Sequence, residues 1–129
     1  MSVTLSDPMQ SDYFQIQPAG DIAVMTPAAE VENLPSNLIE PAAQIVLATL
    51  RADPPTYLVV DLSQVGFFGS EFISFMLRCH LLVKKRHSEL VLAGVSPRIR
   101  ELLRQTALDT LWAIYDSKEQ ALQELRSSD

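Results

Sequence analysis

The first apolar segments of the chain are short and lie on either side of a turn. Residues 13–17 alternate between apolar and polar positions, which is typical of a half-buried β-strand, and residues 22–25 form a second apolar run. Between them, Pro18-Ala19-Gly20-Asp21 carries the residue types that favour a tight turn. The pattern therefore predicts a β-hairpin at the start of the fold.

Later in the chain, continuous apolar runs alternate with segments in which apolar residues recur at helical spacing. The clearest helical stripe joins Phe72, Phe75, Met76 and Cys79, and Ser96-Pro97 has the residue types of a helix start. The predicted strands cover residues 13–17, 22–25, 57–62, 90–95 and 111–115. The predicted helices cover about 38–51 and 70–86, Ser96-Pro97 to about 106, and Asp116-Ser117 to about 126.

The order of these elements predicts an α/β fold. A hairpin followed by alternating helices and strands favours a mixed, mostly parallel sheet of about five strands with about four helices packed on it. The chain of 129 residues suits one domain, which we expect over residues 12–127. Residues 1–11 are polar and contain Pro8, and we expect them to form a flexible leader.

Composition indicates a globular, cytoplasmic protein. Hydrophobic residues make up 47% of the chain and charged residues 20%. No apolar run approaches the roughly 20 residues that span a bilayer, and the N-terminus lacks the basic and apolar segments of a secretion signal. A single cysteine, Cys79, cannot form an internal disulfide. We therefore expect no membrane insertion.

The formal net charge of −6 is unevenly distributed. Residues 1–56 hold seven acids against one base, Arg51, whereas the rest of the chain is balanced. Nucleic-acid binding depends strongly on the neutralisation of phosphates by basic residues, and this chain has no basic stripe. The charge pattern therefore argues against a nucleic-acid partner.

The sequence offers no catalytic group, cofactor site or metal site. It has no glycine-rich phosphate loop, and His80 and His87 have no third ligand near them. Cys79 lies on an apolar helix stripe, where a small buried residue is favoured over a nucleophile. Asp61 ends a strand, where it favours capping of the following turn over acid–base chemistry. We expect a protein that is not an enzyme.

Several short segments in the second half of the chain form a specific pattern. They are Asp61-Leu62-Ser63, Val95-Ser96-Pro97, Arg100-Glu101-Leu102-Leu103, Leu108-Asp109, Ile114-Tyr115-Asp116-Ser117 and Ala121-Leu122. With these segments, residues 57–125 resemble the STAS domain family of sulfate transporters and anti-sigma factor antagonists, most specifically in the C-terminal part, whereas residues 13–50 resemble the family only in strand order. The resemblance implies a STAS-like sheet with an N-terminal hairpin.

For a member of the antagonist type, the resemblance also implies a partner and a site. The partner would be an anti-sigma factor that is also a serine kinase, and it would phosphorylate the serine that opens the helix after Asp61-Leu62-Ser63. Ser70 falls on that serine, and its hydroxyl would lie at or next to the N-cap. A phosphate there would add about −1.5 to −2 charges, which repels an acidic or closely packed partner. The expected partner-binding residues are Gly69, Ser70, Glu71, Phe72, Ser74 and Phe75.

Three residues depart from the family pattern, and two of them, Glu71 and Phe72, have two interpretations each. Gly69 replaces an acid, Glu71 replaces a serine or threonine, and Phe72 replaces a glycine. Glu71 would either mimic the phosphate in part or deter a kinase, or it would only complement the helix dipole. Gly69 would only turn the chain, and Phe72 would either meet the partner or fill the core.

Two functions follow from these observations. The first is an anti-sigma factor antagonist switched at Ser70, and the alternative is a STAS scaffold without phosphoregulation in a lipid-transport or sensor assembly. The sequence also allows a second partner surface at the basic residues Lys84-Lys85-Arg86 and at Arg98, Arg100 and Arg104. It also allows a homodimer.

Overall fold

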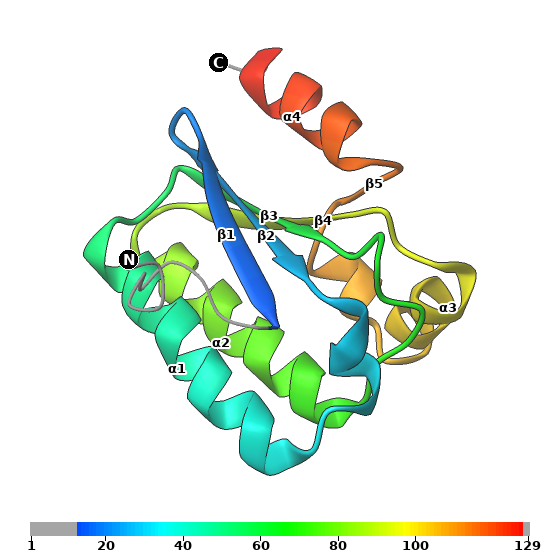
Figure 1. Cartoon of the computed structure of the whole chain (residues 1–129). Helices are drawn as coiled ribbons and strands as arrows, with labels where there is room; N and C mark the ends of the chain where they lie inside the picture. The colour runs from blue at the N-terminus through cyan, green and yellow to red at the C-terminus, as the bar shows by residue number, and fades with distance from the viewer. Residues whose placement is uncertain (1–12, 128–129) are drawn as a thin grey trace.

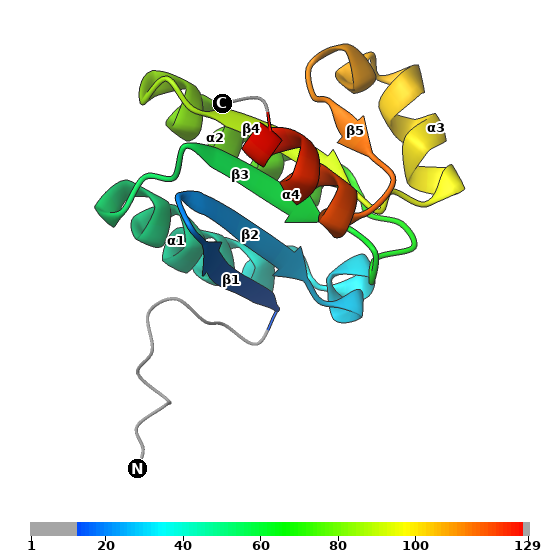
Figure 2. The same cartoon turned by 90° about the horizontal axis from the view of Figure 1, so that it is seen from above.

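The computed structural model describes residues 13–127, and these form a mixed sheet with helices on both faces (Figures 1 and 2). The predicted leader, residues 1–11, lies outside the described residues. The strands are β1 (Phe14–Ala19), β2 (Ile22–Pro27), β3 (Tyr57–Asp61), β4 (Glu89–Ala93) and β5 (Ile114–Tyr115). The α-helices are α1 (Ser36–Ala52), α2 (Ser70–Lys85), α3 (Pro97–Gln105) and α4 (Lys118–Ser127), and the 3-10 helices are η2 (Ala29–Asn33) and η3 (Leu108–Thr110).

The strands lie in the order in which they occur in the sequence. β1 and β2 pair in antiparallel fashion as a hairpin, and β2 to β5 run parallel. Crossover connections between parallel strands are right-handed. Because each new parallel strand is added at the same edge of the sheet, every crossover helix lies on the same face. Figure 1 shows α1 and α2 beneath the sheet and α4 on the opposite side. The predicted α/β fold with an N-terminal hairpin is confirmed.

The two faces of the sheet bury different amounts of apolar surface. Alternation along β3 directs Leu58 and Val60 into the large core beneath the sheet, whereas Val59 points toward α4. The large core contains the side chains of α1, α2 and α3, whereas α4 covers a smaller cluster with Ala121 and Leu125. The large core is therefore the layer that fixes the position of α2.

Some predicted boundaries were wrong. Residues 111–113 are not part of β5: Trp112 is buried in the core and Leu111 is exposed, so only two residues of that apolar run pair with β4. Helix α1 begins at Ser36, earlier than expected, and contains Pro41. β4 ends at Ala93 because Gly94 adopts φ +67°, a left-handed conformation that a strand does not continue.

Candidate functional site at the start of helix α2

The loop between β3 and α2 begins with a turn that Asp61 holds. Its side chain is 7% exposed, and its Oδ1 accepts a hydrogen bond of 3.1 Å from the backbone N–H of Ser63. A carboxylate that bonds to the N–H two residues later stabilises a turn. The predicted turn-capping role of Asp61 is confirmed. A Cβ on Gly94 would lie 3.0 Å from the Cβ of Ser63, so the end of β4 supports this turn at close range.

The same loop is attached to the start of α3. Ser96 caps α3, since its Oγ accepts from the N–H of Ile99 at 3.1 Å, and the hydroxyl donates to the carbonyl of Gly66 at 2.8 Å. The Arg98 guanidinium lies 4.4 Å from the ring centroid of Phe67. Such a cation–π contact contributes about 0.5–1 kcal/mol at an exposed site. The sequence does not reveal these contacts, because they join residues about 30 positions apart.

Ser70 is the first residue of α2, and it is exposed. The N-cap is Gly69, whose carbonyl accepts the first helical hydrogen bond from the N–H of Ile73 at 3.2 Å. Among residues 13–127, the hydroxyl of Ser70 makes no hydrogen bond, so the expected capping bond is not formed. A side chain at the first helical position already has helical backbone angles and points away from the free N–H groups that an N-cap side chain reaches.

The other predicted partner-binding residues divide into an exposed set and a buried set. Glu71 and Ser74 are exposed and lie beside Ser70 on the first turns of α2. Phe72 and Phe75 are 1% and 0% exposed, so the expectation that their side chains contact a partner does not fit their positions. The physical reason is the helical period, which directs these two side chains inward while Ser70, Glu71 and Ser74 face solvent.

Phe72 and Phe75 instead anchor the start of α2 in the core. The ring centroids of Phe72 and Phe68 lie 4.7 Å apart, those of Phe75 and Phe14 4.9 Å, and those of Phe72 and Phe75 5.8 Å. Aromatic pairs at such distances add about 0.5–1.5 kcal/mol to the free energy of burial. The exposed hydroxyl of Ser70 therefore stands on a rigid support, and the interpretation of Phe72 as a core residue is confirmed.

The groups with catalytic potential do not converge on this site. Burial raises the pKa of the Cys79 thiol to about 12, so the thiolate that a nucleophile needs is not formed near neutral pH. Nδ1 of His80 accepts a hydrogen bond of 3.2 Å from the indole N–H of Trp112. Within the described part of the chain, no group of three or more His, Cys, Asp or Glu side chains could hold a metal ion.

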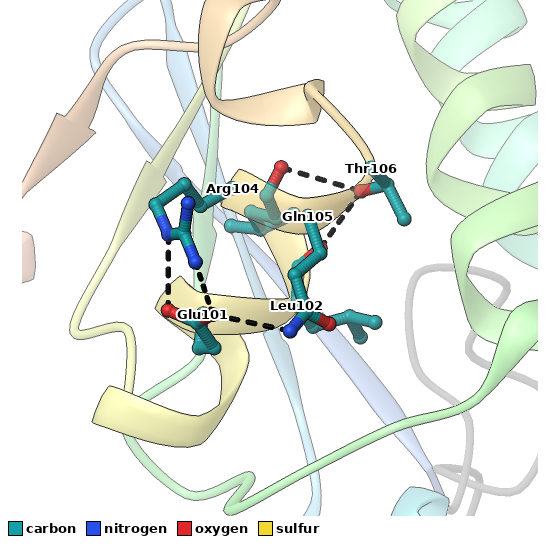
Figure 3. Close-up of polar contacts among 6 residues, drawn as sticks. Glu101, Leu102, Arg104, Gln105 and Thr106 are labelled. Carbon is teal, nitrogen blue, oxygen red and sulfur yellow. Dashed lines mark hydrogen bonds and ion pairs between the residues drawn. The ribbon is translucent and has the colours of Figure 1, made fainter.

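The basic residues of α3 are partly neutralised by an acid on the same helix. Figure 3 shows Arg104 bound to the Glu101 carboxylate through two nitrogens, with Nε at 3.0 Å from Oε1, while Gln105 donates to the same carboxylate at 3.1 Å. The hydrogen bond from Arg104, which has the largest effect, and the one from Gln105 lower the pKa of the Glu101 carboxyl. Arg104 is therefore not available as an isolated cation, and Arg98 and Arg100 remain as the exposed bases of α3.

The family of the chain follows from a sequence comparison. A family model described as "Mlab, STAS domain" matches residues 40–115, which is more than half of the chain. The chain belongs to the STAS domain family. The loop, Ser70 and strands β3 to β5 of this STAS domain lie within the matched segment.

Solved structures of STAS proteins have the same fold. An anti-sigma-factor antagonist (STAS) domain protein from Planctomyces limnophilus is 28% identical, with a TM-score of 0.78, and the match covers 88% of this chain and 97% of that one. SpoIIAA in its unphosphorylated form matches at 16% identity and a TM-score of 0.75, covering 88% and 96%. The Bacillus cell fate determinant SpoIIAA in its phosphorylated form matches at 15% and 0.64, covering 87% and 98%.

A sequence comparison and the lengths of the helices give two further findings on this STAS domain. No curated protein matches its sequence. Among residues 13–127, no helix has the length and apolar character that crossing a membrane requires.

Proposed function

We propose that this STAS domain is a non-enzymatic, cytoplasmic regulatory protein that acts as an anti-sigma factor antagonist. In this proposal it binds an anti-sigma factor that is also a serine kinase, through the surface that Gly69, Ser70, Glu71 and Ser74 form. Phosphorylation of Ser70 by that kinase releases the partner. The observation that carries the proposal is the exposed hydroxyl of Ser70, which opens α2 and is held by no hydrogen bond within residues 13–127.

The physical basis of the proposed switch is a difference between folding and binding. A phosphate on Ser70 would lie at the N-terminus of α2, where the helix dipole favours negative charge, so the domain would stay folded. The same charge would stand on an exposed surface that already carries Glu71. A partner that packs closely there would have to desolvate a dianion, which disfavours binding.

The similarity to known antagonists supports this assignment. The 28% identical Planctomyces limnophilus protein is an anti-sigma-factor antagonist (STAS) domain protein, and the anti-sigma factor antagonist SpoIIAA has been solved in unphosphorylated and phosphorylated forms. The test is to mix the protein with its cognate kinase and ATP and to measure its intact mass. We expect one added phosphate on the parent protein and on Ser74→Ala, and none on Ser70→Ala. A phosphate that persists on Ser70→Ala, or no phosphate at all, rejects the switch.

A second candidate function is a STAS scaffold that binds its partner without phosphorylation, in a lipid-transport or sensor assembly. The observation that favours it is the fixed charge of Glu71 directly after Ser70, together with Gly69 at the N-cap. Affinity for the partner distinguishes the two candidates. Binding that is equal in Ser70→Asp and the parent protein supports the scaffold, whereas binding that is lost only in Ser70→Asp supports the switch.

A further inference from the structure

A pocket of about 470 Å³ lies at the end of α2 that is farthest from Ser70. Residues 54–56, which lead into β3, and residues 85–88, which lead into β4, form its walls. Helix α2 has 16 residues, so this pocket is about 24 Å from Ser70 along the helix axis. It therefore forms a surface separate from the proposed partner site.

The turn that forms one wall has an unusual residue at its strained position. The N–H of His87 donates to the carbonyl of Lys84 at 3.0 Å, and the N–H of Ser88 donates to that of Val83 at 2.9 Å. This pattern is a Schellman motif, whose residue after the C-cap is usually glycine because it needs a positive φ. Here that residue is His87, with φ +62°. The chain thus keeps an imidazole where glycine would be less strained, and such outliers cluster at functional sites.

Strain alone does not mark a site, because Ala107 adopts φ +61° just after α3. The turn at His87 differs in being fixed against a second wall. The buried hydroxyl of Ser88 donates to the carbonyl of Pro55 at 2.5 Å, and the N–H of Thr56 donates to the carbonyl of Asp21 at 2.8 Å. The pocket is therefore preorganised, which lowers the entropic cost of holding a ligand.

The charged groups at the pocket are mostly cations. Lys85 and Arg86 are exposed and form no ion pair with any residue in the range 13–127, whereas Lys84 is bound to Glu89 at 3.0 Å. Three carboxylates lie next to its walls. Asp21 accepts a hydrogen bond of 3.1 Å from the hydroxyl of Thr56, Asp53 directly precedes Pro54, and Glu89 is bound to Lys84. Lys85 and Arg86 are therefore the cations of the pocket lining that no ion pair neutralises within residues 13–127.

We propose that this pocket binds a phosphate group, carried either by a small molecule or by a phospholipid headgroup. The guanidinium of Arg86 can offer two parallel N–H groups to phosphate oxygens, and the ammonium of Lys85 adds a point charge. The imidazole of His87 offers an N–H donor in each of its protonation states. The proposal is independent of the partner and of the phosphorylation of Ser70.

The first experiment is a titration of the isotope-labelled protein with inorganic phosphate, followed by NMR at constant ionic strength. We expect saturable shifts confined to the amides of Thr56 and of residues 85–88, with a Kd on the order of 1 mM. Lys85→Gln/Arg86→Gln should weaken binding at least about tenfold. Arg100→Gln/Arg126→Gln removes the same charge elsewhere on the exposed surface and should leave Kd unchanged.

His87→Gly tests the role of the strained turn. We expect phosphate to bind more weakly and the melting temperature to rise by about 3 °C, since glycine relieves the left-handed strain but lacks the imidazole. Shifts spread over all basic residues, equal losses in both double variants, or unchanged binding in Lys85→Gln/Arg86→Gln would overturn the proposal.

Vesicle sedimentation identifies the source of the phosphate. Binding to phosphatidylglycerol vesicles but not to phosphatidylcholine vesicles, lost in Lys85→Gln/Arg86→Gln, supports a lipid headgroup. Saturable binding of inorganic phosphate without vesicle binding supports a soluble phosphate compound. The absence of both excludes the phosphate site.

Discussion

The two ends of α2 are built in opposite ways. At the N-terminal end, Gly69 has φ −104° and an open surrounding, and the hydroxyl of Ser70 makes no hydrogen bond within residues 13–127. At the C-terminal end, His87 is held at a positive φ and Ser88 is fixed to Pro55. The difference teaches that one end of a helix can carry a side chain without internal hydrogen bonds, while the backbone at its other end is fixed by a strained turn and by a buried hydrogen bond.

The largest expected effect concerns the support beneath Ser70. Phe72→Ala should lower the free energy of unfolding by about 3–5 kcal/mol, because it leaves a cavity among Phe14, Phe68 and Phe75. Ser70→Ala should change it by less than about 0.5 kcal/mol, since its side chain is exposed. Urea unfolding of both variants measures the difference. Similar losses in the two variants would contradict the division of this end into a rigid support and a free hydroxyl.

The next effect concerns His80, in the second half of α2. Burial, with a smaller contribution from Lys84, lowers the pKa of His80, and its Nδ1 accepts from Trp112, so protonation would remove this acceptor. The unfolded chain then binds the proton more readily, and stability is lost as pH falls below about 6.5. We expect a loss on the order of 1 kcal/mol, measured by thermal unfolding between pH 7.5 and 5.

His80→Leu provides the control for this pH dependence. It leaves the buried indole N–H of Trp112 without its partner and should cost about 1–3 kcal/mol at pH 7.5. The variant should also lose the part of the pH dependence that His80 causes. If the slope between pH 7.5 and 5 were the same in both proteins, another group would be responsible.

A smaller effect is expected from the strained turns. His87→Gly and Ala107→Gly should each raise the free energy of unfolding by about 1 kcal/mol, because glycine adopts a positive φ without the steric cost of a Cβ. Gly69→Ala at the other end should not stabilise the fold, since Gly69 has no left-handed strain to relieve and alanine is a poorer N-cap than glycine. Chemical denaturation checks all three, and a gain in Gly69→Ala similar to that in His87→Gly would remove the contrast between the two ends.

The smallest effect is expected at Ser70 itself. Ser70→Asp should change the free energy of unfolding by about 0.5 kcal/mol or less, because the favourable helix dipole is opposed by the neighbouring charge of Glu71. Calorimetric melting at low and high salt would measure both contributions. A loss of more than about 2 kcal/mol would mean that added charge disturbs the fold, contrary to the proposed switch.

Much of the fold could be predicted from the sequence because its signals are local. The helical spacing of Phe72, Phe75, Met76 and Cys79 correctly indicates the buried face of α2, and Ser96-Pro97 marks the start of α3. The resemblance assigned Phe72 and Phe75 to the partner surface, whereas the spacing had already indicated the core. Where the family resemblance and the helical spacing of apolar residues disagreed, the helical spacing correctly indicated which side chains are buried.

The rest could not be predicted because it depends on tertiary contacts. The apolar run 111–115 indicated a strand, but the contact of Trp112 with His80 on α2 directs the chain away from the sheet until Ile114. In the candidate site, the sequence located Ser70 at the start of a helix but not the contacts of Ser96 with Gly66 or of Arg98 with Phe67. The left-handed conformation of His87 was likewise not evident, because glycine is the usual residue there.

The sequential order of the strands has a consequence for synthesis on the ribosome. Every strand after β1 pairs with the strand that precedes it in the chain, so each newly emerged segment finds a template that is already complete. Among the elements of residues 13–127, α4 packs back against β3 and β4, and it emerges after both strands. We expect vectorial assembly, in which stalled nascent chains that end before α4 already protect the β2–β3 amides from hydrogen exchange.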